Sequence, residues 1–133
     1  MAISTPLDDA LHLTIPLRSE YGASLRPVAA AFGAGAAFSL EDIDDLRLAV
    51  SEVFSSALQR HGSRAALTAV FTNAAPGMQV GLLVLAEDGS PGVIELDDLA
   101  FSIIQAATDH VEVEEFSVRL FKHCSEIVGN HRR

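Results

Sequence analysis

The residues with the clearest capacity for chemistry lie on one face of a predicted helix. Glu52 and Ser56 are four positions apart, so a helix places one directly above the other. A helix carboxylate that faces a cleft can act as a general base or position a water molecule, and a serine hydroxyl can ligate Mg²⁺. The simpler alternatives are a solvated glutamate on an amphipathic helix and a small residue that packs against a neighbouring element.

A second candidate is the loop from Glu87 to Gly92, whose sequence is EDGSPG. It follows a strongly apolar segment, and its glycine, proline and serine residues are typical of a loop. Within it Asp88 precedes Gly89, and Asp-Gly is among the commonest turn dipeptides. A ligand-binding role and a structural turn explain Asp88 equally well, so both alternatives stay open at this point.

The helix that would position the first pair spans Ser39 to Gly62. Ser39 can cap its start, and Asp42 three residues later can complete a variant of the capping box. His61 lies at the end, where the helix dipole favours positive charge, and Gly62 is suited to stop the helix. An apolar stripe recurs at three- and four-residue steps through Leu40, Ile43, Leu46, Val50, Val53, Ala57 and Leu58.

The other elements follow from local patterns. We expect strands at Leu11–Pro16, Arg64–Thr72 and Met78–Ala86, and helices from about Glu20 to Phe32 and from Asp97 or Asp98 to about Thr108. Pro27 should start or kink a helical turn, and Gly33–Ala37 should form a loop. The alternation in His110–Lys122 changes parity between Val113 and Phe116, which predicts either a bulge or a tight reversal between two short strands.

This order of elements predicts an α+β fold, a two-layer sandwich of a mostly antiparallel mixed sheet with three helices on one face. The expected organisation is a disordered N-terminus over residues 1–10, one domain over 11–124 and a C-terminal tail over 125–133. A chain of 133 residues is within the usual size of one domain.

Composition excludes several classes of function. The formal net charge of -9 argues against nucleic acid and anionic membranes as partners. Cys124 is the single cysteine, so an internal disulfide and a multi-cysteine zinc site are excluded. We expect neither a transmembrane helix, since no apolar run reaches about 18 residues, nor a signal peptide at the N-terminus. A cytoplasmic location follows by default.

The segment LRLAVSEVFSSALQRHG, Leu46 to Gly62, resembles the N-box helix of the GHKL (Bergerat-fold) ATPases. It is most similar to the branch of anti-sigma-factor serine kinases, whose helix carries a glutamate followed four residues later by an asparagine. Glu52 matches the glutamate, whereas Ser56 stands at the asparagine position. The order of elements also agrees with that fold from Leu11 to Lys122, and Arg26 falls where these kinases often carry an arginine.

The resemblance implies a role for each candidate residue. Glu52 would be the catalytic carboxylate, and Ser56 would replace the asparagine that helps to hold Mg²⁺. Asp88 would bind the adenine amino group, with Gly89 and Gly92 in place of the family's Asp-x-Gly-x-Gly, although the spacing departs by one residue.

The resemblance weakens at the lid that would cover the phosphates. The family carries a Gly-x-Gly-Leu segment there, whereas Ile94 to Ser102 of this chain, IELDDLAFS, contains no glycine. Asp97 and Asp98 would repel a triphosphate. We therefore expect no cofactor, with ATP and Mg²⁺ binding only if the site is functional.

Three functions are compatible with these observations. The first is a regulatory anti-sigma-factor-like protein that binds a sigma factor or a STAS-type anti-anti-sigma partner and has a degenerate nucleotide site. The second is an active Mg-ATP-dependent serine/threonine kinase that phosphorylates an anti-anti-sigma factor. The third is a non-catalytic dimerising structural module. The family often dimerises, so a homodimer is compatible with each.

Overall fold

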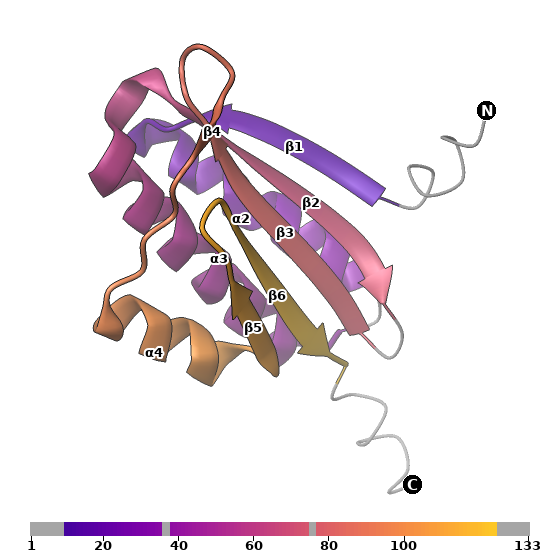
Figure 1. Cartoon of the computed structure of the whole chain (residues 1–133). Helices are drawn as coiled ribbons and strands as arrows, with labels where there is room; N and C mark the ends of the chain where they lie inside the picture. Colours follow the sequence, from indigo (N-terminus) through magenta and orange to yellow (C-terminus); the bar gives the residue numbers. More distant parts are fainter. Residues whose placement is uncertain (1–9, 36–37, 75–76, 125–133) are drawn as a thin grey trace, which may run out of the picture.

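Alternating apolar residues in the strands and a periodic apolar stripe on the long helix fold the chain into two layers. The computed structural model describes residues 10–35, 38–74 and 77–124. Figure 1 shows its elements, which are β1 (Ala10–Pro16), α2 (Ser19–Gly35), α3 (Leu40–His61), the 3₁₀ turn η1 (Gly62–Arg64), β2 (Ala66–Ala74), β3 (Gly77–Leu85), β4 (Pro91–Gly92), α4 (Asp98–Ala107), β5 (His110–Val113) and β6 (Ser117–His123).

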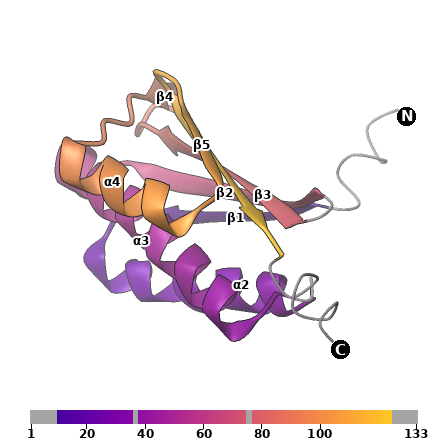
Figure 2. The same ribbon diagram turned by 90° about the horizontal axis from the view of Figure 1, so that it is seen from below.

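The strands form one sheet in the order β1-β2-β3-β6-β5, and β4 pairs with the end of β3. Every pairing among the described residues is antiparallel. The three helices cover one face of this sheet (Figure 2), and α3 lies between α2 and α4. The predicted α+β sandwich with three helices on one face is confirmed.

The core lies between α3 and the inner face of the sheet. The register places Phe71 opposite Val80, and Val80 opposite Leu120, so buried side chains cross β2, β3 and β6 in rows. Buried Leu46, Val50, Val53 and Ala57 of α3 pack onto these rows. At about 25 cal/mol per Å² of apolar surface, this burial is the main source of stability.

Helix α3 begins and ends as the sequence predicts. The Ser39 hydroxyl accepts a hydrogen bond from the Asp42 N–H at 3.1 Å, and the Asp42 carboxylate accepts one from the Ser39 N–H at 3.4 Å. Gly62 follows the helix with a φ of 74°, a conformation that favours glycine. The capping box therefore fixes the register of the helix face that carries Glu52 and Ser56.

Helix α2 is longer than predicted. It runs to Gly35, through Pro27 and into the expected Gly33–Ala37 loop. Pro27 is exposed, whereas Leu25 and Ala29 are buried, and this packing outweighs the local propensity. Gly33 lies in the helix at a close approach to α3, where a Cβ would lie 3.1 Å from Cγ1 of Ile43. Ala36 and Ala37, the end of the expected loop, lie outside the described residues.

Two uncertain segments are resolved. The prediction of a loop over the whole of Glu87–Gly92 is wrong at its end, because Pro91 and Gly92 pair with the end of β3. The parity change is a tight reversal and not a bulge, since Glu114 N–H donates to Ser117 O at 2.8 Å between β5 and β6.

The sequence predicts a disordered N-terminus over residues 1–10 and a tail over residues 125–133. The predicted C-terminal tail lies outside the described residues, as does the predicted disordered N-terminus up to residue 9. Within the described part of the chain, none of the helices has the length and apolar character that crossing a membrane requires.

Candidate functional site

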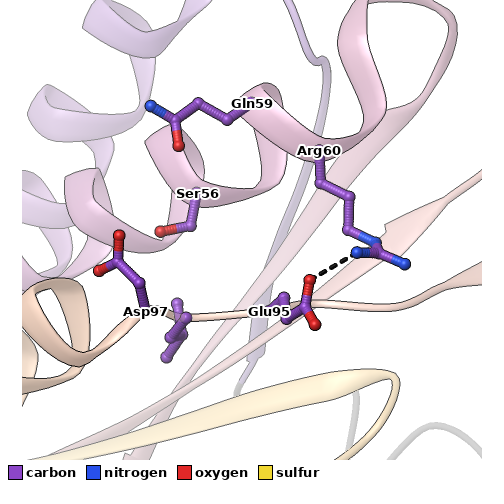
Figure 3. Close-up of a pocket in the computed structure, with 6 residues that line it drawn as sticks. Ser56, Gln59, Arg60, Glu95 and Asp97 are labelled. Atoms are coloured by element: carbon purple, nitrogen blue, oxygen red, sulfur yellow. Dashed lines mark hydrogen bonds and ion pairs between the residues drawn. The ribbon is translucent and has the colours of Figure 1, made fainter.

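A hollow of about 620 Å³ lies between the C-terminal half of α3 and the segment that leads into α4. Figure 3 shows its lining residues, which come from two stretches of chain: Ser56, Gln59 and Arg60 from α3, and Glu95, Leu96 and Asp97 from the segment. We call this hollow the Ser56 pocket. It lies beside the helix face that the sequence singled out.

Only one of the two α3 candidates lines this pocket. Ser56 is half-buried at its wall, whereas Glu52, also half-buried, lies one helical turn earlier and is not among the lining residues. Within the described part of the chain, the Glu52 side chain makes no hydrogen bond or ion pair. Nothing in its surroundings therefore activates this carboxylate in the way that a general base requires.

Carboxylates dominate the charge of the Ser56 pocket. Arg60 is its basic lining residue, and Arg60 Nη1 already pairs with Glu95 Oε1 at 2.5 Å. Asp97 adds a second carboxylate, whose Oδ1 accepts the Ala100 N–H at 2.8 Å and caps α4. One arginine against two carboxylates leaves a pocket wall that repels anions.

Asp88 lies elsewhere, at the tip of the β3–β4 hairpin. Its Oδ1 accepts hydrogen bonds from the Ser90 hydroxyl at 2.6 Å and the Ser90 N–H at 2.9 Å. These bonds, the hydroxyl first, hold the pKa of the fully exposed Asp88 carboxyl below its usual value. Asp88 lines a shallow hollow with Ala86 and Glu87, so the structure does not bring it into the Ser56 pocket.

The two glycines of the loop have different local roles. Gly89 has a φ of 88° and forms the turn that Asp88 stabilises. Gly92 is buried, and a Cβ there would lie 2.8 Å from Cε1 of His61 and 3.0 Å from Cγ1 of Val84. Gly92 therefore allows the chain to pass close to the end of α3.

The lining of the Ser56 pocket is a poor fit for Mg-ATP. A triphosphate would have to approach Glu95 and Asp97, and the arginine that could compensate is already paired. Among the described residues no group of three or more His, Cys, Asp or Glu side chains could hold a metal ion. We therefore derive no chemical step through nucleotide or metal.

A second concave surface follows the seam between α2 and α3. It consists of two adjoining hollows of about 260 and 250 Å³ that share Arg26 and Ser51. Leu48, with 46% of its surface exposed, lies in the second hollow beside Arg47. We call this surface the α2–α3 groove. Its lining residues are Ser19, Gly22, Ala23, Arg26, Asp44, Arg47, Leu48, Ser51, Phe54, Ser55 and Leu58.

Arg26 is distinguished from the other basic residues by its lack of an ion pair. Each of the other described lysines and arginines pairs with a carboxylate: Arg18, Arg47, Arg60, Arg64, Arg119 and Lys122. Arg47 has in addition a buried Nε atom with no hydrogen-bond partner. The groove therefore holds cationic hydrogen-bond donors that no described residue satisfies.

This groove could not be predicted from the sequence, because the pairing of each arginine depends on residues brought together by folding. The sequence does show that acidic residues outnumber lysines and arginines, so that most of these cations are expected to be paired. That signal alone does not tell which arginine stays unpaired.

Comparisons with known proteins show the fold. No model of a known protein family matches this sequence. No curated protein matches it. A solved structure does: the RsbU and RsbW domains of Rv1364c from Mycobacterium tuberculosis, with a TM-score of 0.63 and 15% sequence identity over 86% of this chain.

The match covers 32% of the other chain, so this chain spans about a third of its length. At 15% identity such a likeness establishes architecture alone. The likeness confirms the predicted arrangement of three helices on an antiparallel sheet, which this chain shares with the matched part of that structure.

Proposed function

We propose that this protein is a regulatory, anti-sigma-factor-like protein that binds a sigma factor or a STAS-type anti-anti-sigma partner. Its nucleotide site is degenerate, and it acts in the cytoplasm by sequestering the partner. The observation that carries the proposal is the α2–α3 groove, in which Arg26 alone among the described lysines and arginines has no ion pair.

The groove suits a segment that combines acidic and apolar side chains. Arg26 and Arg47, the latter paired with Asp44, line the same hollow as the exposed Leu48 and offer cationic donors there. An arginine buried at the centre of a protein interface is a common hot spot, worth 2 kcal/mol or more. In a chain of net charge -9, such a groove also directs an acidic partner to one place on an otherwise repelling surface.

The degenerate nucleotide site is supported by the Ser56 pocket. Ser56 replaces the amide of the family pattern, and Glu95 and Asp97 occupy the wall along which phosphates would lie. Asp88, the counterpart of the adenine-binding aspartate, lines a separate hollow. Binding of a protein partner therefore accounts for this chain better than phosphate transfer.

The test is calorimetric titration of the full chain with a purified sigma factor or STAS-domain protein. Arg26→Ala should weaken binding roughly 10- to 100-fold, because the partner's carboxylate loses its counter-charge. Arg64→Ala is the matched control, since Arg64 pairs with Glu87 outside the groove, and it should change affinity less than about threefold. Equal losses in the two variants, or no binding by the wild-type chain, would contradict the proposal.

An active serine/threonine kinase remains the second candidate, because Glu52 and Ser56 do lie on neighbouring turns of α3. It predicts phosphate transfer to a serine of the STAS partner that Glu52→Gln abolishes. Transfer that survives in Glu52→Gln, or no transfer at millimolar Mg-ATP, would exclude it.

A further inference from the structure

The segment Val93–Asp97, which we call the strap, is fastened to the end of α3 by two adjacent residues. His61 Nε2 lies 2.6 Å from the Val93 carbonyl oxygen, in a half-buried position where the ring nitrogen donates. Arg60 Nη1 lies 2.5 Å from Glu95 Oε1. The two contacts hold alternate residues of the strap.

The remaining residues of the strap are also anchored. The Ile94 N–H donates to Glu115 O at 3.2 Å, in the reversal between β5 and β6, and the Ile94 side chain is buried. Leu96 packs against the core, and Asp97 caps α4. Segments that open readily have few buried contacts, whereas every residue of this segment has an anchor.

Gly92, the residue before the strap, also lies close to the His61 ring. The absence of a side chain at Gly92 lets β4 lie against the His61 ring, since a Cβ would come within 2.8 Å of Cε1. The ring therefore lies against two consecutive residues, Gly92 and Val93. This close fit fixes the orientation in which His61 reaches the Val93 carbonyl.

From these contacts we infer that Arg60 and His61 form a latch that locks the strap against α3. The latch is an autoinhibitory contact, because it fixes the Glu95 carboxylate in the wall of the Ser56 pocket, next to the Asp97 carboxylate that caps α4. Any ligand whose entry moves the strap must first break both contacts. The inference concerns the Ser56 pocket and holds whether or not the α2–α3 groove binds a partner.

The experiment measures hydrogen exchange of the Ile94 amide by NMR in the full chain. His61→Ala removes the partly buried bond of the latch, and exchange at Ile94 should accelerate about 5-fold, as expected for the loss of one hydrogen bond. Glu95→Gln removes the exposed ion pair and should accelerate it about 2-fold. Arg64→Ala, which breaks an ion pair outside the strap, should leave it unchanged.

Gly92→Ala provides an independent variant that leaves both latch residues in place. Its new methyl group should displace the His61 ring and accelerate Ile94 exchange as His61→Ala does. Amides of Val80 and Leu120 in the sheet centre report global opening. Faster exchange at Ile94 alone supports the latch. Unchanged exchange at Ile94, or equal acceleration of all three amides, would overturn it.

Discussion

Lys122 provides the sharpest test of how the layers are held together. This β6 side chain is 11% exposed and points inward, where its Nζ lies 3.1 Å from Asp45 Oδ2 and 3.8 Å from Asp42 Oδ1. The pair thus connects the sheet to the first turns of α3, and Asp42 also belongs to the capping box of that helix.

The magnitude follows from the geometry. At an effective dielectric constant of about 20, one pair of charges at the shorter distance interacts by roughly 5 kcal/mol. Desolvation of the ammonium group opposes part of this, and Asp45 is partly exposed, so we expect Lys122→Met to lower the free energy of unfolding by about 3 kcal/mol. That corresponds to a decrease in Tm of about 10 °C for a domain of this size.

The assay is urea unfolding followed by circular dichroism. Arg119→Met is the matched control, because Arg119 lies on the same strand and pairs with Glu112 at 2.7 Å while remaining 43% exposed. The control should lose less than about 1 kcal/mol. If both variants lose the same amount, the argument that burial makes the Lys122 pair stronger is refuted.

Two further predictions test local geometry. Ser90→Ala should raise the pKa of Asp88 towards its usual value, which NMR titration measures. Because hydrogen bonds lower this pKa in the folded state, the stability they contribute is present at neutral pH and is lost as the pH falls through the folded pKa. An Asp88 pKa that does not change in Ser90→Ala would contradict this prediction. Gly77→Ala should lower the free energy of unfolding by about 3 kcal/mol in the same urea assay, because the new Cβ would overlap the Lys122 carbonyl oxygen. The control is Gly81→Ala on the same strand, which has open space around it and should lower the free energy of unfolding by about 1 kcal/mol or less.

The fold could be predicted from sequence to the extent that local signals agree with packing. The α3 caps and stripe depend on residues close in the chain, and the structure confirms them. The end of α2 could not be predicted, because glycines at positions 33 and 35 locally favour a loop, whereas in the fold Gly33 lies in close contact with Ile43 on another helix. Likewise β4 comprises only Pro91 and Gly92, too short a segment for any alternation to be visible.

The same distinction, between local signals and contacts made by folding, applies to the candidate site. The periodicity of α3 sufficed to place Glu52 and Ser56 on neighbouring turns, but it could not tell that the pocket wall reaches Ser56 and stops short of Glu52. Asp88 illustrates the other limit. An Asp-Gly dipeptide fits both a turn and a ligand site, and the choice depends on whether Ser90 or a ligand takes the hydrogen bonds of the carboxylate.

On the proposed function, the residues of this chain that depart from the GHKL pattern depend on one another. A lid without glycine has less conformational freedom than a glycine-rich one, which makes stable anchoring of the strap less unfavourable. Anchoring in turn requires Arg60 and His61 to contact residues more than 30 positions away, Glu95 and Val93. Once the strap is anchored, its carboxylates form the pocket wall, and restoring an asparagine at Ser56 alone would leave that wall in place. If the proposed degenerate site is correct, nucleotide binding should therefore require release of the strap in addition to Ser56→Asn, and Ser56→Asn alone should not produce it.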